Sequence, residues 1–548
     1  MTSQRKFSAA FRRKWMLVMV LCLVAAGAAG QHQAPATSAQ ATHAPANPTA
    51  GDKGKTAGRI TPDQAQKLFG MVDQILKFSS DETGLPVKET VKRQLTTRAA
   101  VESYLHEKLD EDQDAKRMQR SEIVLKKFGL LDRDFDLKPF LLLLLKEQIE
   151  AYYDPKTKTV NLLDWINPDD QRPVLAHELT HALQDQRVNL EKWSDQTPPD
   201  VSTNSSEDKD HLAKDELDTA RNAVVEGQAT AVMMDNILKP MGHSLLKDPQ
   251  VVELIKQQMN HATDSPVLAR APLLLSESLL FPYREGLSFE QDVWMDKGQT
   301  AAFQGTLDQP PTSSWEIMNP RMYEQRMMPP VPLMPDIHPL VDKLYEPYDI
   351  GQVGQLDTHI LTGILGGEQA ARDLTSAWDG GLYWAGQLRA ATAAQRATTK
   401  SIALLYLSVW RNVPSAQHFA RLYASELGRK YSGLKPDTNA APAATASEGD
   451  VEQVFTTDEG PVVITTRGKM VFVTESFPLE LARKLTELVL DAQGTGAMQI
   501  ATAAHLPHVT GALRSPAAQD SLTGGLVRFF ADCGVMKAAV DGGLRAAH

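Results

Sequence analysis

One stretch constrains this chain more than any other: Val174–Leu183, which reads Val-Leu-Ala-His-Glu-Leu-Thr-His-Ala-Leu. Its apolar residues recur with helical spacing, and Pro173 is typical of a first helical turn, so we predict a buried helix. At 3.6 residues per turn, His177 and His181 lie on one face, where two imidazole nitrogens can reach the same metal ion. Glu178 lies between them, beside the metal, where a carboxylate can accept a proton from water.

A third candidate ligand lies on a later segment, Leu212–Leu238, which has the pattern of a long helix. Glu226 is at its centre among small residues that include Gly227. Small side chains let a helix pack closely against a neighbour, and a carboxylate buried at such a contact needs a positive partner. The natural partner is the metal that His177 and His181 would hold.

The first thirty residues differ in composition from the rest. Five basic residues precede an apolar run, Trp15–Val24, which ends in the small residues Ala25–Gly30. This order is typical of a secretory signal peptide, so we expect residues 1–30 to be cleaved and the protein to be exported, either periplasmic or secreted. The alternative is an uncleaved N-terminal anchor, which would be the only membrane attachment we expect.

Charge and cysteine content limit the possible partners. Removal of residues 1–30 leaves 52 basic and 68 acidic residues, a net charge of −16, so we do not expect nucleic-acid binding. Cys22 lies in the signal segment, and Cys533 alone cannot form an internal disulfide. Stability must come from packing and from metal binding.

A β-hairpin is expected directly before the motif helix. Ile149–Tyr153 and Thr159–Leu163 are rich in aromatic and β-branched residues, and they flank the turn signal Asp154-Pro155. An edge strand here would be able to hold an extended peptide over the metal. An ordinary sheet edge explains the pattern equally well.

The pattern His177-Glu178-x-x-His181, followed by a helix that bears Glu226, resembles the gluzincin group of zinc metallopeptidases, the thermolysin-like clan. The resemblance implies a zinc ion held by His177, His181 and Glu226, with water in the fourth position. It also implies that Glu178 is the general base of peptide-bond hydrolysis.

Further segments resemble a poorly characterised set of exported bacterial gluzincin-type proteins, among them Tyr152–Pro155 and Phe281–Phe289. Such enzymes carry a Tyr or His donor for the oxyanion after the glutamate helix. The resemblance therefore makes Tyr283 a catalytic candidate, with His211 and His359 as weaker alternatives. A tyrosine that simply packs with a satisfied hydroxyl is the other interpretation of Tyr283.

The chain departs from the thermolysin-like pattern in two ways. His181 and Glu226 are 45 positions apart, a longer separation than usual, and we predict that the polar, acidic segment Leu190–Asp210 within it is a loop. Thr230 stands where thermolysin-like chains have an aspartate that orients a histidine. Asp185, one turn after His181, is the candidate to replace that carboxylate.

These patterns predict an α+β fold, with a mainly helical zincin-like catalytic domain, a small edge-strand sheet and a small C-terminal α+β unit. At 548 residues the chain exceeds one hydrophobic core. The predicted segments are a signal peptide over 1–30, a disordered linker over 31–58, a zincin-like metallopeptidase domain over 59–350, a small α+β domain over 368–490, and a low-complexity, partly helical or disordered tail over 491–548.

The sequence therefore predicts an exported, zinc-dependent metallopeptidase that acts on peptide or protein substrates. Two alternatives remain open. One is a non-catalytic exported scaffold or binding protein with a structural or vestigial zinc site; the other is a zinc hydrolase that acts on a cell-wall peptide or a non-peptide amide. A structural zinc site usually has four protein ligands, and the sequence offers no obvious fourth Cys or His near the motif, so we favour the enzyme.

Overall fold

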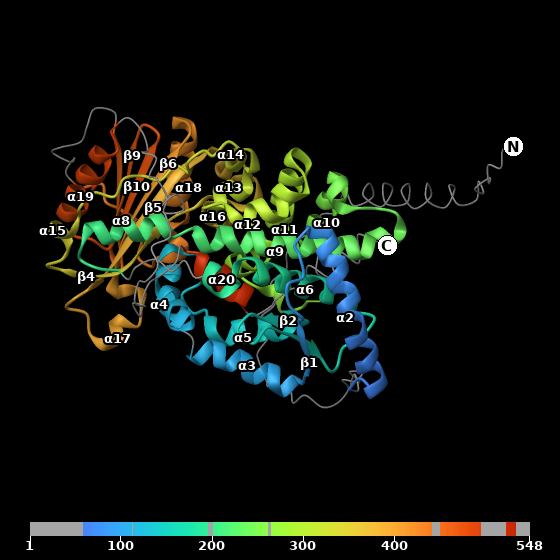
Figure 1. The fold of residues 1–548 in the computed structure, drawn as a ribbon. Coiled ribbons are helices and arrows are strands. Elements are labelled where there is room, and N and C mark those ends of the chain that lie inside the picture. The colour runs from blue at the N-terminus through green and yellow to red at the C-terminus, as the bar shows by residue number, and fades with distance from the viewer. Residues whose placement is uncertain are drawn as a thin grey trace, which may run out of the picture. The chain divides into compact units, whose positions relative to one another are not determined.

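The computed structural model describes residues 59–111, 113–194, 201–260, 265–440, 450–494 and 522–532 (Figure 1). The predicted signal peptide and linker lie outside the described residues, as do Cys533 and most of the predicted tail. Contacts place the described residues in one unit, Ala57–His548. None of the helices in the described ranges is both long and apolar enough to cross a membrane.

Helices dominate the first part of the described chain and a large sheet lies in the later part, which confirms the α+β class. The longer helices of the first part are α2 (Pro62–Thr83), α3 (Arg98–Glu111), α4 (Gln113–Phe128), α5 (Leu137–Gln148), α6 (Gln171–Val188), α8 (Ser205–Lys214), α9 (Leu217–Leu238), α10 (Pro249–Asn260) and α11 (Leu273–Lys297). Short helical segments are α7 (Leu190–Ser194), η1 (Lys239–Met241), η2 (Leu245–Lys247), η3 (Leu268–Arg270), the π-helix η4 (Ala301–Gly305), α12 (Thr306–Asp308), α13 (Ser314–Met318), α14 (Pro320–Glu324) and α15 (His338–Val341). The later elements are β4 (Tyr345–Gln352), α16 (Gln355–Ala377), β5 (Trp378–Leu388), α17 (Ala393–Arg396), η5 (Thr399–Ser401), β6 (Ile402–Trp410), α18 (Val413–Lys430), β7 (Lys435–Pro436), β8 (Val451–Thr457), β9 (Gly460–Arg467), β10 (Met470–Glu475), α19 (Leu479–Ala492) and α20 (Gly524–Asp532).

A three-stranded sheet precedes the motif helix. It consists of β1 (Lys92–Thr96), β2 (Ala151–Asp154) and β3 (Thr159–Leu163) in the order β1-β3-β2. The predicted hairpin is confirmed, because β2 and β3 pair antiparallel, and β2 lies at an edge of the sheet. Strand β1, which pairs parallel with β3, was not predicted because it is short and mostly polar.

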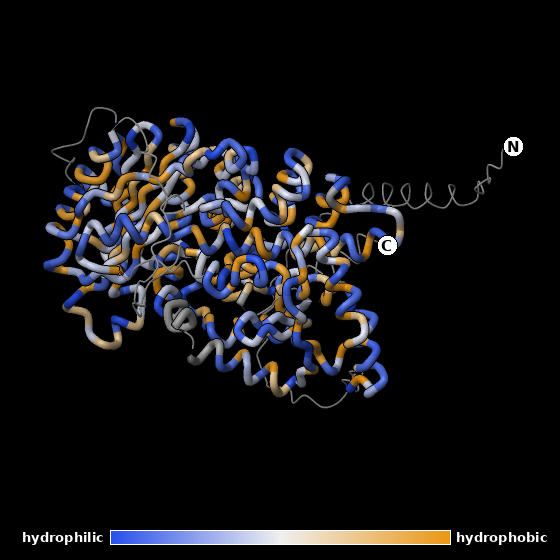
Figure 2. Tube along the Cα trace, in the orientation of Figure 1, coloured by the Kyte–Doolittle hydropathy of each residue, from blue (hydrophilic) through white to orange (hydrophobic). Residues whose placement is uncertain are grey.

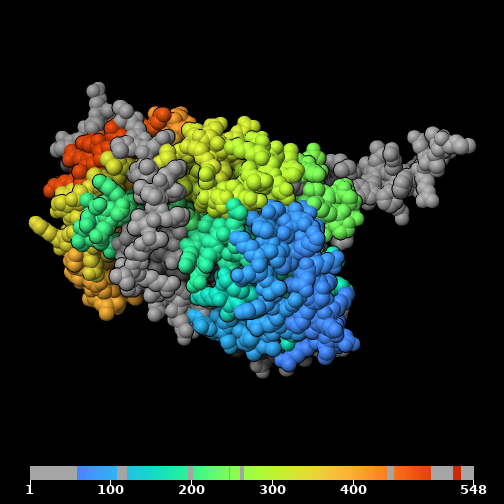
Figure 3. Space-filling view, viewed as in Figure 1, coloured from blue at the N-terminus to red at the C-terminus, as the bar shows by residue number. Residues whose placement is uncertain are grey.

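The motif helix α6 is held on several sides. Leu175, Leu179 and Leu183 are fully buried, and each such burial contributes roughly 1.5–3 kcal/mol. The helix packs against α2 and α9. In the space-filling view, the blue surface of the N-terminal helices lies beside the teal surface of the segments that follow α5 (Figure 3). Tertiary packing therefore fixes the helix that carries both histidines.

Helices α9 and α11 touch through their backbones, and Figure 1 shows them side by side. A Cβ added to Gly227 would lie 2.3 Å from the carbonyl carbon of Gly286, and one added to Gly286 would lie 2.0 Å from the carbonyl oxygen of Ala223. No side chain larger than hydrogen fits at either glycine without moving a helix. The predicted close packing of the Glu226 helix is thus confirmed.

The segment between the predicted ligands is more helical than expected. The predicted loop Leu190–Asp210 contains α7 and the start of α8, so that prediction is partly wrong. The predicted helix Leu212–Leu238 is interrupted at Asp215 and Glu216. Their side chains accept hydrogen bonds from Gln352 N and Ser314 N, so contacts with distant segments replace a continuous helix here.

The later part contains a seven-stranded antiparallel sheet in the order β4-β5-β6-β10-β9-β8-β7. Its central strands are orange in the hydropathy view, as expected for strands with both faces covered (Figure 2). The predicted α+β unit over 368–490 contains both strands and helices, and β4 is an unpredicted strand before residue 368. Helix α16, which leads into β5, contains a non-helical residue, Gly367, with φ 74°.

Candidate metal centre

The three predicted ligands lie together in the structure. His177 and His181 come from successive turns of α6 and Glu226 comes from the middle of α9. Glu226 Oε2 is 3.0 Å from Nε2 of His177 and 3.5 Å from Nε2 of His181. One ligand atom from each residue lies within 4.8 Å of the others, so this buried group could hold a metal ion.

The donor set and its spacing fit a zinc ion. Two imidazole nitrogens and one carboxylate oxygen are a usual catalytic zinc set, and ligand atoms about 2.0–2.1 Å from a tetrahedral zinc lie roughly 3.3 Å apart. The distances from Glu226 Oε2 to His177 and His181 bracket that value. Two of the three separations therefore suit a tetrahedral ion, and the nitrogens of His177 and His181 lie within 4.8 Å of each other.

Electrostatics also favour a cation between these side chains. Burial lowers the pKa of His177 to about 4, so this imidazole is neutral. Burial opposes charge on His181 as well, but attraction to Glu226 outweighs it and raises the pKa of His181 to about 9. The same attraction overcomes the effect of burial on Glu226 and lowers its pKa to about 2. A metal ion at this position would replace the proton of His181 as the positive charge beside a buried carboxylate.

Glu178 is 1% exposed and lies beside the group. Burial raises its pKa to about 7, although a hydrogen bond from the backbone N–H of Tyr153 on strand β2 works in the opposite direction. Its Oε1 is a buried atom without a hydrogen-bond partner among the described residues. A carboxylate with this pKa and an unused oxygen can accept a proton near neutral pH.

The residue that orients His181 is Gln184, which the sequence analysis missed. His181 Nδ1 donates to Gln184 Oε1 at 2.9 Å. The prediction that Asp185 has this role is wrong, because its carboxylate accepts hydrogen bonds from Tyr153 Oη at 2.8 Å and from Lys158 Nζ. Asp185 thus joins α6 to the β2–β3 hairpin. The three-residue spacing from His181 to Gln184 was the available signal, because positions i and i+3 share a helix face.

His177 is oriented differently. Its Nδ1 is buried and has no hydrogen-bond partner in the described part of the chain, and the same is true of Thr230 Oγ1. Thr230 therefore does not take over the role of the aspartate expected from the thermolysin-like pattern. The contact of its Nε2 with Glu226 and the ring of Tyr283 hold the imidazole of His177.

Tyr283 lies on α11, and its ring stacks on that of His177 with 6.1 Å between centroids. Tyr283 is 2% exposed, and its role as oxyanion donor stays a prediction. The weaker alternatives have other neighbours: His211 lies 3.7 Å from Asp215, and His359 Nδ1 lies 3.3 Å from Thr375 Oγ1. Tyr283 is thus the candidate that the structure brings next to a ligand.

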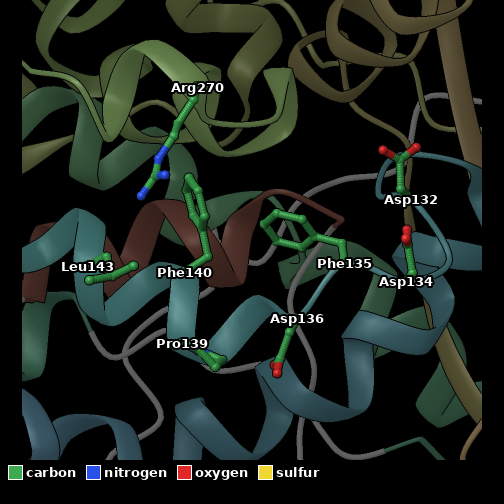
Figure 4. A pocket seen from close by; sticks show the side chains of 8 residues that line it. All are labelled: Asp132, Asp134, Phe135, Asp136, Pro139, Phe140, Leu143 and Arg270. Carbon is green, nitrogen blue, oxygen red and sulfur yellow. The ribbon is translucent and has the colours of Figure 1, made fainter. Parts of the chain in front are cut away.

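A separate open pocket of about 480 Å³ is lined by other residues (Figure 4). It has an apolar wall that includes Phe135 and Phe140, with Arg270 positioned 6.0 Å from the ring of Phe140. None of the candidate metal ligands lines it. The pocket is therefore not part of the metal centre.

Comparison with protein-family models, with curated proteins and with solved structures finds no match to this chain.

Proposed function

We propose that this protein is an exported zinc metallopeptidase of the gluzincin type, with a zincin-like catalytic domain. The observation that carries the proposal is the meeting of His177 and His181 with Glu226, a residue from a different helix, while Glu178 lies alongside. Export is supported by the composition of residues 1–30. Peptides or proteins are the proposed substrates.

In this proposal a zinc ion held by the three ligands would supply a Lewis acid that polarises the scissile carbonyl and makes water more acidic. Glu178 takes a proton from the attacking water and passes it to the leaving amine. Tyr283 donates its hydroxyl to the developing oxyanion. Strand β2, which lies at an edge of the sheet and contacts Glu178 through the backbone of Tyr153, pairs with an extended substrate.

The variant Glu178→Gln tests the proposal. It keeps the shape of the side chain but removes the base, so we expect full zinc content with cleavage of a mixed peptide library reduced about 10²- to 10⁴-fold. Metal content is measured on the purified full chain by elemental analysis, and cleavage by mass spectrometry with and without a chelator. Glu191→Gln, an exposed acid just after α6, is the matched control and should keep normal cleavage.

A second variant, Glu226→Gln, tests the ligand set. Loss of a residue that only orients a ligand costs about 10- to 100-fold in metal affinity, so loss of a ligand should cost more. Normal zinc affinity in this variant would remove Glu226 from the ligand set. Unchanged turnover in metal-replete Glu178→Gln would refute the peptidase mechanism.

One observation favours a non-catalytic alternative, a scaffold with a structural or vestigial zinc site. The side chains of His177 and Glu226 are only 1% and 5% exposed, and His181 retains 12%. Against it, the group contains three protein donors in the described residues, the number typical of a catalytic site with one open position. Zinc binding without any chelator-sensitive cleavage would support the scaffold.

A further inference from the structure

A chain of buried amides leads away from His181. Gln184 and Gln228 are both fully buried, and they come from α6 and α9. Gln184 Nε2 donates to Gln228 Oε1 at 2.9 Å and to Val225 O at 3.0 Å. Three neighbouring side chains are thereby joined in the order His181, Gln184, Gln228.

The far end of this chain is anchored on backbone carbonyls of the π-helix η4. Gln228 Nε2 donates to Ala302 O at 3.0 Å and to Phe303 O at 3.2 Å. It also donates to Thr306 Oγ1 at 2.8 Å, and this hydroxyl gives its own proton to Ala302 O. Glu290 Oε1, at 3.5 Å, is too distant to decide the direction of these bonds.

These backbone carbonyls fix the donor and the acceptor of each hydrogen bond between Gln228 and His181. A backbone carbonyl can only accept, so the atom of Gln228 that faces Ala302 and Phe303 must be the amide nitrogen. Its oxygen then faces Gln184, which must present its own nitrogen there and to Val225 O. The oxygen of Gln184 is left to face His181, whose Nδ1 must therefore carry a proton.

We infer that Gln184 is a positioning residue that keeps a proton on Nδ1 of His181, so that Nε2, the nitrogen that faces Glu226, is the one that can bind the metal, with this arrangement set by the main-chain carbonyls of Val225, Ala302 and Phe303. The inference rests on the proposed metal centre. It assigns to an amide the role that a carboxylate or backbone carbonyl usually has toward a metal-ligating histidine. His177, whose Nδ1 has no partner in the described residues, lacks such a support.

Zinc affinity of the full chain, measured by competition with a chromophoric chelator, tests this role. Gln184→Met keeps the length of the side chain and removes the acceptor, so the zinc Kd should rise about 10- to 100-fold. Gln184→Glu keeps an acceptor for His181 but loses the donor to Val225 O. It should unfold at a lower temperature than the wild type and still bind zinc at least as tightly.

Two further variants separate positioning from general stability. Gln228→Met breaks the chain one link from His181 and should raise the zinc Kd by less than Gln184→Met does. Gln186→Met, on the same helix, removes hydrogen bonds to the backbone of Lys88 and Glu89. It should lower stability without changing the zinc Kd.

The outcomes are distinct. Wild-type affinity in Gln184→Met, or equally weak binding in Gln184→Glu and Gln184→Met, would overturn the inference while leaving the metal centre intact. If Gln184→Met does not fold, the other two variants decide. Tighter zinc binding by Gln184→Glu than by Gln228→Met supports the inference, and weaker zinc binding by Gln184→Glu than by Gln228→Met overturns it. A wild-type chain that binds no zinc would instead refute the proposed function, and the role of Gln184 with it.

Discussion

The seven-stranded sheet and the helical metal centre both bury a carboxylate beside cationic or polar groups, but they satisfy it differently. Glu475, the last residue of β10, accepts hydrogen bonds from Lys430, Tyr423 and Tyr431. We name these four residues the Glu475 cluster. Each buried polar side-chain atom of these four residues has a partner. In the metal centre, Glu178 Oε1 and His177 Nδ1 have none within the described chain.

This difference separates a structural site from one suited to an external ligand. The Glu475 cluster is closed, because its own lysine and hydroxyls neutralise the charge and use the lone pairs of the carboxylate. In the candidate metal centre, by contrast, the protein supplies no partner from the described residues for one oxygen of Glu178 and one nitrogen of His177. Buried polar groups without partners are costly, so a bound ligand that supplies partners would stabilise this site.

Loss of a partner should therefore be most damaging in the closed site. Glu475→Gln leaves Lys430, whose side chain is 5% exposed, without its counter-charge, so we expect a loss of about 3–5 kcal/mol in the free energy of unfolding. Urea denaturation measures this change, and the zinc affinity of the folded variant should be unchanged. Glu368→Gln, which removes an exposed partner of Arg372, is the control and should have little effect. A similarly small effect of Glu475→Gln would show that the cluster does not depend on its ion pair.

Close packing holds α9 and α11 together, so a methyl group added at their contact should disrupt the candidate metal centre. Gly286→Ala pushes a Cβ toward Ala223 O and forces α11 away from α9, at a cost of about 1–3 kcal/mol or more. Zinc affinity should fall as well, because α9 carries Glu226. Gly428→Ala on α18, where nothing lies within 4 Å of the new Cβ, should instead be neutral or stabilising by about 0.5–1 kcal/mol. Thermal unfolding and zinc titration of both variants check this contrast, and an unaltered Gly286→Ala protein would contradict the packing described here.

His338 is an intermediate case, because both of its nitrogens have partners but the contact depends on a proton. Its Nδ1 and Nε2 lie 3.0 Å from Asp342 and Asp208, and the carboxylate of Asp336 is nearby. Burial disfavours its charge, but these carboxylates outweigh burial and raise the pKa of His338. A raised folded-state pKa stabilises the protein below the unfolded pKa of about 6.5, and this stability is lost as the pH rises through the folded value. Burial raises the pKa of Asp208 to about 6, which acts in the same direction.

The corresponding prediction is the smallest in size. Below pH 6.5 the wild type should be about 1 kcal/mol more stable than His338→Gln, and the difference should shrink as the pH rises. Urea denaturation across a pH series measures it. His418→Gln, at an exposed position on α18, is the control and should show no such trend. A constant difference at all pH values would exclude a protonated His338 as its cause.

Local patterns in the sequence predicted much of the helical part of the fold. Pro173 lies in the first turn of α6, as predicted, and the spacing of His177 and His181 gives a shared helix face. Glu226 was found because small residues surround it. Each of these signals lies within a few residues of the feature that it predicts.

Features that depend on distant partners were missed. Strand β4 gains its hydrogen bonds from β5, and the break at Asp215 depends on Gln352, more than 130 positions away. The spacing of Gln184 from His181 indicates a shared helix face, but the direction of its hydrogen bonds depends on Gln228 and η4, which are distant in the sequence. Asp185 was preferred because carboxylates are the commoner partners of ligand histidines, but its carboxylate forms an ion pair with Lys158 of the hairpin.

The anchor at Ala302 and Phe303 belongs to the main chain, and this has an evolutionary consequence. Their side chains are buried in the core and are constrained by packing, but a substitution there does not remove the two carbonyls. An exchange at position 184 alone would instead leave Gln228 facing the wrong atom. Among relatives of this chain, positions 184 and 228 should covary, whereas any apolar substitutions at positions 302 and 303 should occur independently of both.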